Sequence, residues 1–137
     1  MTIQRRRLMT LSALAALMPG ATRHAFAAGS PGVSKNEIVI GSIQDLSGPL
    51  VSFGKPTRYG MVMRVDQANA AGGVNGRKIK LVVEDSGYDT KKAVLAADKL
   101  VGSDQVFAVI GTLGATPALA TMETIIGSGA LHLFPLT

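Results

Sequence analysis

The chain has 137 residues, a formal net charge of +5, a pI near 9.9, and neither cysteine nor tryptophan. A domain commonly takes ~100–150 residues, so this length fits one domain and excludes a two-domain enzyme within the chain. The lack of cysteine excludes disulfides and thiolate metal sites, and 47% hydrophobic against 17% charged residues excludes a disordered chain.

The first 27 residues have the pattern of a secretory signal peptide. Arg5–Arg7 precede the apolar run Leu8–Met18, and Ala25–Ala27 form a small-x-small cleavage pattern before Ala28. The run has 11 residues, fewer than the ~20 that span a bilayer. A buried helix is the alternative, but its N-terminus would carry three arginines against the helix dipole. We expect cleavage near Ala27/Ala28 and a periplasmic location, by either the Sec or the twin-arginine route.

Most of the excess positive charge lies in this signal segment. Without residues 1–27 the chain has 10 basic and 9 acidic residues, a net charge of +1. Its remaining basic residues show no stripe with interleaved aromatics, so no nucleic-acid partner is expected. We interpret residues 28–36 as a leader and residues 37–137 as the folded part.

The folded part alternates short β-branched runs with amphipathic stretches. Strands are expected at Glu37–Ile43, Lys78–Glu84, Val106–Ile110 and Ala130–Phe134. The first helix is predicted from about Pro56 to Ala71, the second from an N-cap at Asp89, and the third from an N-cap at Thr116 to Gly127. Inward-facing residues are expected to be Val94, Leu95, Leu100 and Val101 in the second helix, and Leu119, Met122, Ile125 and Ile126 in the third. A tight turn with positive φ is expected at Val74–Arg77. This order predicts an α/β fold, an open parallel sheet flanked by helices on both faces.

In such sheets ligands bind beyond the carboxyl ends of the strands, where the strand order reverses. The loops to consider are therefore Gln44–Lys55, at 11 residues from Gln44 to Gly54 unusually long, and Gly111–Thr116. Neither has the spacing of a phosphate-binding or dinucleotide-binding loop. The second brings free backbone N–H groups to a helix start, which favours a carboxylate. Plain helix capping, and a surface loop with Phe53 packed on the core, are the alternatives.

Residues for catalysis are few. His24 leaves with the signal segment, and His132 falls in an expected buried strand, where a structural role is favoured. Asp45 adjoins the first loop, and the acidic residues after the second strand are best explained as helix caps. We expect no enzyme activity, no metal and no cofactor.

Several segments together resemble a known family. The SGP…FG loop, the NAAGGVNGRKI run, the EDSGYDTKKAV segment and the GTLG loop occur in family order from about Ile38 to the end of the chain. They resemble the N-terminal lobe of the leucine/isoleucine/valine-binding proteins, the type I periplasmic solute-binding proteins of ABC importers. The resemblance implies a receptor whose two lobes close on a small solute and which delivers it to a membrane permease.

The resemblance also implies site residues. Ligand-binding positions carried over from the family are Leu50, Val51, Ser52, Phe53, Leu113, Gly114, Ala115, Thr116 and the end of the chain from Pro135 to Thr137. Phe53 would form an apolar wall, and Thr116 with nearby amides would hold a carboxylate. Family members often have consecutive hydroxyl residues here, whereas this chain has Ala115 before Thr116. The ligand is therefore left open as an amino acid, or a related organic acid or amide.

Family members continue beyond the point where this sequence stops. We therefore expect a partial N-terminal lobe, and weak or no binding by the chain alone, because ligands between two lobes contact both. The alternative function is a sensory or regulatory ligand-binding domain of the same fold.

Overall fold

The computed structural model describes residues 29–136, so the expected signal peptide and Thr137 lie outside the described residues. Its elements are β1 (Glu37–Gln44), α1 (Val51–Ala70), β2 (Lys78–Asp85), α2 (Thr90–Asp98), the π-helical turn η1 (Lys99–Ser103), β3 (Ala108–Ile110), α3 (Ala115–Gly127) and β4 (Leu131–Leu133). Within this range no helix is both long and apolar enough to cross a bilayer.

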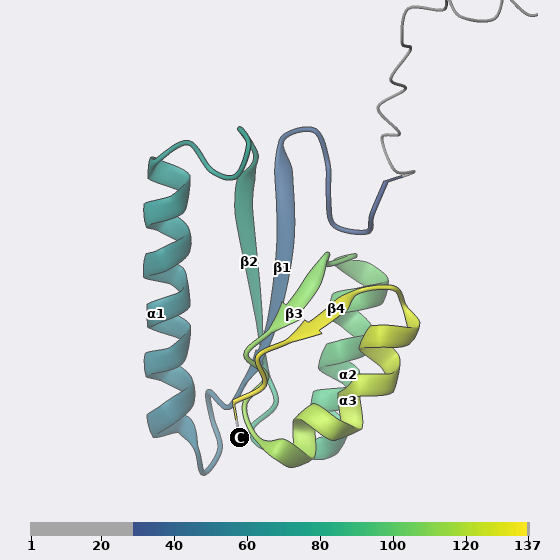
Figure 1. Cartoon of the computed structure of the whole chain (residues 1–137). Helices are drawn as coiled ribbons and strands as arrows, with labels where there is room; N and C mark the ends of the chain where they lie inside the picture. The colour runs from purple at the N-terminus through teal and green to yellow at the C-terminus, as the bar shows by residue number, and fades with distance from the viewer. Residues whose placement is uncertain (1–28, 137) are drawn as a thin grey trace, which may run out of the picture.

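The four strands form one parallel sheet in the order β2-β1-β3-β4. Helix α1 covers one face, and α2 with α3 covers the other (Figure 1). β1 runs in register with β2 from Glu37↔Lys78 to Gln44↔Asp85 and meets β3 at Ile40↔Ala108. The predicted open parallel α/β sheet is confirmed, and all four strands end at the same edge of the sheet.

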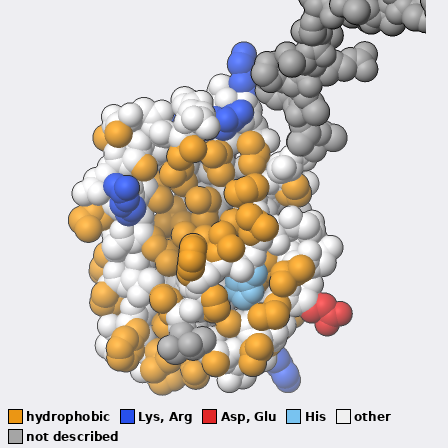
Figure 2. All heavy atoms as spheres, viewed as in Figure 1, with side chains coloured by type: hydrophobic (Ala, Val, Ile, Leu, Met, Phe, Trp, Pro, Cys, Tyr) orange, Lys and Arg blue, Asp and Glu red, His pale blue; other side chains and the backbone are white. Residues whose placement is uncertain are grey.

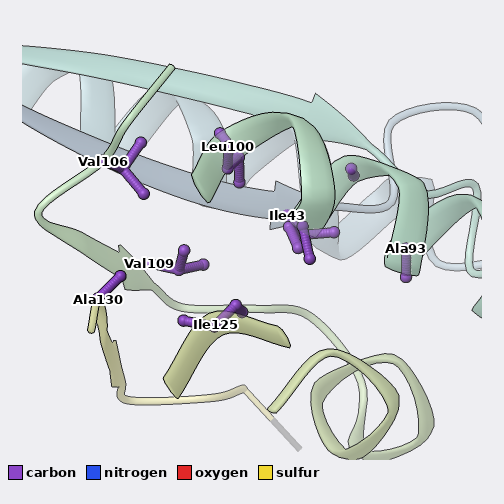
Figure 3. Close-up of a cluster of buried hydrophobic side chains, with 9 residues drawn as sticks. Ile43, Ala93, Leu100, Val106, Val109, Ile125 and Ala130 are labelled. Atoms are coloured by element: carbon purple, nitrogen blue, oxygen red, sulfur yellow. The ribbon is translucent and has the colours of Figure 1, made fainter. Parts of the chain in front are cut away.

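The main core lies between the sheet and the α2/α3 layer (Figure 3). Ile43 of β1, Val109 of β3 and Ile125 of α3 are fully buried, as is Leu100 of η1. Burying each such side chain contributes roughly 1.5–3 kcal/mol. The apolar strand runs therefore position the sheet edge on which the site is built.

Two local predictions are confirmed in detail. Asp89 caps α2, and its carboxylate accepts a hydrogen bond from the N–H of Lys92 at 2.8 Å. Asn75 and Gly76 have φ of 52° and 79°, as a tight turn with positive φ requires. Both features depend on neighbours in the sequence, which is why the sequence could predict them.

Helix α1 starts earlier than predicted, at Val51 instead of Pro56. The buried carboxylate of Asp45 accepts hydrogen bonds from the N–H groups of Gly48 and Leu50, which turns the chain directly into the helix. The predicted long loop is therefore wrong: it spans only residues 45–50. Val51, Ser52 and Phe53 belong to the first turn of α1.

Helix α3 also starts earlier, with Gly114 as its N-cap at φ 95°, so the predicted cap at Thr116 is wrong. The predicted inward face is wrong for three of its four residues, because Leu119, Met122 and Ile126 are exposed. Ile125 is buried as predicted, and the other buried residues of the helix are Pro117, Ala118 and Thr121. Small side chains face inward because α3 packs closely against the alanine-rich face of α2, where Ala93 and Ala97 are buried.

Leu95 of α2, predicted to face inward, is likewise 67% exposed. Leu100, in contrast, is fully buried as expected. The third and fourth strands are shorter than predicted, and Phe134 has a left-handed φ of 51° just beyond β4.

Candidate functional site

A cavity of about 660 Å³ lies at the carboxyl ends of the strands. It is lined by residues from α1, from the segments after β1, β2, β3 and β4, and from the start of α3: Leu50, Phe53, Thr57, Tyr88, Leu113, Gly114, Ala115, Pro135 and Leu136. Four separate chain segments thus meet at the edge where ligands bind in open parallel sheets.

Seven of the residues predicted for the site line this cavity, namely Leu50, Phe53, Leu113, Gly114, Ala115, Pro135 and Leu136. Three others do not line it, namely Val51, Ser52 and Thr116. Ser52 and Thr116 are exposed on the first turns of α1 and α3. Thr137 lies outside the described residues, but its neighbours Pro135 and Leu136 are cavity residues.

Sequence reasoning missed two lining residues, Thr57 and Tyr88. Thr57 lies one helical turn after Phe53, so the early start of α1 places both on the same face. Tyr88 lies in the segment after β2, which the strand-order argument did not consider. An aromatic residue between Gly87 and Asp89 was the available signal.

The ring of Tyr88 packs against Gly114. A Cβ atom at Gly114 would lie 2.3 Å from Cε2 of Tyr88, closer than any real contact. Gly114 therefore serves two purposes, since its φ of 95° starts α3 and its missing side chain admits the ring. This contact joins the segment after β2 to the loop after β3.

Backbone hydrogen bonds beyond the strands hold the cavity walls together. The N–H of Leu113 donates to the carbonyl of Ile43 at 2.9 Å, and the N–H of Gly114 donates to Leu136 at 2.7 Å. The N–H of Leu136 in turn donates to Thr112 at 2.9 Å. The segment after β4 is thus fixed to the loop after β3.

A buried polar group ties together the ends of β1 and β3 beside the cavity. Nε2 of Gln44 donates to the carbonyl of Gly111 at 2.6 Å and to Oγ of Ser42 at 2.8 Å. Oγ of Ser42 donates to the carbonyl of Ile110 at 2.8 Å. Oε1 of Gln44 has no hydrogen-bond partner among the described residues. The network fixes the β3 end from which the Gly111–Thr116 segment leaves.

Among residues 29–136, no carboxylate, lysine or arginine lines the cavity, and the polar side chains that line it are Thr57 and Tyr88. Backbone N–H groups in the first turn of α3 have no partner within the helix, and this end of the helix dipole is positive. The arrangement can therefore hold an apolar group beside a polar or anionic head, without a nucleophile or an acid–base pair.

Two titratable groups near this edge have shifted pKa values. Burial by itself raises the pKa of Asp85, but hydrogen bonds from Ser47 and from the N–H groups of Leu46 and Gly87 lower it by more. The net result is a pKa below the usual value of an aspartate. Burial lowers the pKa of His132, whose Nε2 lies 3.0 Å from Oγ1 of Thr112. Asp85 joins the segment after β1 to the segment after β2 through Leu46 and Gly87. His132 contacts Thr112, whose carbonyl accepts a hydrogen bond from the N–H of Leu136.

Other ligand chemistry has little support. Across residues 29–136, histidine and acidic side chains do not gather in groups of three or more that could hold a metal ion. A second cavity of about 440 Å³ lies near the start of β1, between Gly29–Ser34 and Asp104–Gln105. It is at the amino end of the sheet, where open parallel sheets do not bind ligands.

Comparison with known proteins agrees with this geometry. Residues 37–136 match the family described as "Periplasmic binding protein". An "Amino acid binding protein" from Pseudomonas aeruginosa is 34% identical over 99 residues, which are 72% of this chain and 26% of the relative. "Leu/Ile/Val-binding protein homolog 2" from Brucella abortus is 35% identical over 106 residues, 77% of this chain and 28% of that protein.

Solved structures give the same result. The branched-chain amino acid transporter substrate binding protein LivJ from Streptococcus pneumoniae, in complex with isoleucine, matches with a TM-score of 0.69 and 30% identity. The match covers 74% of this chain and 29% of that one. A fatty acid ABC transporter substrate-binding protein from Thermomonospora curvata matches with a TM-score of 0.66 and 32% identity, over 74% and 25%.

The four named relatives are binding proteins, two of them described as components of transporters, and the chain spans about a quarter of their length. The match over residues 37–136 includes every strand and helix described above and all the residues that line the cavity at the carboxyl edge. The chain belongs to the periplasmic binding protein family.

Proposed function

We propose that this chain contributes the solute-binding surface of an extracytoplasmic receptor that serves an ABC importer. The cavity at the carboxyl edge of the sheet carries the proposal, because four segments converge there around an uncharged, largely apolar space. Relatives named for Leu/Ile/Val binding, and one named for fatty acids, support a small organic solute. Its natural partner would be a membrane permease, and residues 1–27 would direct export.

The ligand class follows from what the cavity offers. Phe53, Leu113 and Leu136 supply apolar contact, which suits an aliphatic or aromatic body. The start of α3 supplies backbone donors for a carboxylate. In the part of the chain that the structure describes, no acidic side chain lines the cavity to receive an ammonium group. We therefore propose a carboxylate-bearing solute, amino-acid-like or a simple organic acid.

Nuclear magnetic resonance titration of the chain tests this proposal, because shifts in backbone amide signals detect even weak binding. Isoleucine and hexanoate would be compared with glucose, which has no carboxylate. We expect shifts concentrated around Phe53, Tyr88 and Gly114 with the first two ligands and none with glucose. Affinity should be weak, since this chain forms only one wall; tight binding would contradict that part of the proposal.

Matched variants separate the cavity from the rest of α1. Phe53 and Tyr59 are exposed to the same extent, 63% and 62%, but only Phe53 lines the cavity. Phe53→Ala should abolish the ligand-induced shifts and Tyr59→Ala should retain them. Equal behaviour of the two variants would place the binding elsewhere and refute the proposed site.

A further inference from the structure

The turn that joins α1 to β2 has the sequence Val74-Asn75-Gly76-Arg77 and lies at the amino end of the sheet, away from the cavity (Figure 1). The N–H of Val74 donates to the carbonyl of Arg77 at 2.8 Å, and the N–H of Arg77 donates back at 3.0 Å. Asn75 and Gly76 form the tip, and both are exposed. Figure 2 shows mostly backbone and uncharged polar side chains, drawn in white, along this upper edge of the molecule. The tip is therefore in contact with water.

The backbone around this asparagine is open to attack on its side chain. An asparagine loses its side-chain amide when the backbone nitrogen of the next residue bonds to its Cγ atom, which requires a free nitrogen and room for a ring. Gly76 has no side chain, and even a Cβ atom placed there would meet nothing within 4 Å. Within the described part of the chain, the N–H of Gly76 has no hydrogen-bond partner. Both requirements are met at Asn75.

The other two asparagines of the chain are held by hydrogen bonds. The side chain of Asn69 donates to the carbonyl of Ile79 at 2.8 Å and accepts from its N–H at 2.7 Å, and Asn69 lies within α1. After Asn36, the N–H of Glu37 donates to Oγ of Ser34 at 2.9 Å, so the nitrogen that would attack is already engaged. The sequence contains no further asparagine. The structure thus separates one open asparagine from two protected ones.

We propose that Asn75 is a site of deamidation. The backbone nitrogen of Gly76 gives up its proton to hydroxide and bonds to Cγ of Asn75. The bond from Cγ to the side-chain nitrogen breaks, and this nitrogen leaves as ammonia with a proton taken from water. A second water then opens the cyclic imide at either carbonyl, which gives aspartate or isoaspartate. The reaction consumes water, releases ammonia and needs no oxidant or reductant.

The turn must open before the ring can close. Asn75 and Gly76 have left-handed φ values of 52° and 79°, as in a two-residue hairpin turn, whereas the attack needs a more extended backbone at Asn75. Two hydrogen bonds between Val74 and Arg77 close the turn, and exposed turn tips open locally at low free energy. Isoaspartate adds a methylene group to the backbone, so the modified turn no longer fits between Val74 and Arg77. The product should therefore loosen the entry into β2.

Peptide mapping by mass spectrometry, after incubation of the folded chain at mildly alkaline pH, tests the proposal. Cleavage after Arg64 and Arg77 releases residues 65–77 as one peptide, which contains both Asn75 and the control Asn69. A mass increase of about one dalton should appear at Asn75 at least ~10-fold faster than at Asn69 or Asn36. Part of the product should accept a methyl group from an isoaspartyl methyltransferase, which distinguishes isoaspartate from aspartate.

The same incubation in urea separates the effect of the sequence from that of the fold. An Asn75 that reacts in urea but stays intact in the folded chain would show that the turn protects it, and would overturn the proposal. Equal rates at the three asparagines of the folded chain would also overturn it. Asn75→Gln should abolish the reaction in residues 65–77, because the longer side chain closes a ring far more slowly, and circular dichroism checks that this variant folds.

Discussion

Two glycines of α1, Gly54 and Gly60, allow the packing of this helix to be tested by one substitution with opposite expected effects. A Cβ atom at Gly54 would lie 1.8 Å from the carbonyl oxygen of Asp45, and Gly54 is the one buried residue of the helix. A Cβ atom at Gly60 would meet nothing within 4 Å. Any difference between the two alanine variants therefore reports the contact of α1 with the Asp45 segment.

The expected magnitudes follow from helix propensity and from overpacking. Alanine in place of glycine within a helix stabilises by roughly 0.5–1 kcal/mol, so Gly60→Ala should raise the free energy of unfolding by that amount. At Gly54 the same gain is outweighed, since a rigid backbone atom must move by more than ~1 Å and overpacking costs about 1–3 kcal/mol or more. Gly54→Ala should therefore lower the free energy of unfolding by about 2 kcal/mol.

Thermal and urea denaturation followed by circular dichroism measure both effects. For a domain of this size ~1 kcal/mol shifts Tm by roughly 4–8 °C, so the two variants should differ by more than ~10 °C. Gly54→Ala should also weaken ligand-induced shifts at the cavity, because α1 carries Phe53 and Thr57. If Gly54→Ala proved as stable as Gly60→Ala, the close packing of α1 on Asp45 would be refuted.

Three further changes test the core and the titrating groups. Leu100→Ala should lower the free energy of unfolding by roughly 2–5 kcal/mol, because the side chain is fully buried; a loss below ~1 kcal/mol in urea denaturation would contradict the core assignment. Because burial lowers the pKa of His132 below 6.5, the contribution of this residue to stability is fully present above pH 6.5 and is lost as the pH falls below that value. The Tm values at pH 7 and pH 5 should therefore lie closer together in His132→Gln than in the parent chain. An unaltered pH dependence of Tm in the variant would exclude His132 as its cause. Asp85→Asn removes the charged acceptor of the Leu46 and Gly87 N–H groups and should destabilise by about 1–2 kcal/mol at neutral pH. Because the pKa of Asp85 is lowered from 3.8, its contribution is present above that pH and is lost below it, so the variant and the parent chain should become equally stable in acid.

Several features of the site could be predicted from the sequence. Strand runs separated by helix-length segments fixed the parallel sheet, and the rule for carboxyl ends then indicated the loops after the first and third strands. Leu50, Phe53, Leu113, Gly114 and Ala115 line the cavity accordingly. The two loops follow from local pattern and topology, whereas the individual residues within them were implied by the family resemblance.

The contribution of the segment after β2 could not be predicted in the same way. Tyr88 reaches the cavity only because Gly114 leaves room for its ring, a contact between residues 26 positions apart in the sequence. The start of α1 at Val51 depends on hydrogen bonds from Gly48 and Leu50 to a carboxylate that the fold buries. Neither contact follows from a periodic pattern.

The sequence by itself determined the order of elements, the α/β class, the Asp89 cap and the turn at Asn75-Gly76. Only the tertiary structure decided which face of α3 is buried. Both faces of this helix are apolar, so periodicity could not choose between them, and the large side chains Leu119 and Ile126 were expected inside. Close packing against the alanines of α2 selects small residues for the inner face, because only they allow the two helices to approach. The large side chains are consequently left on the surface.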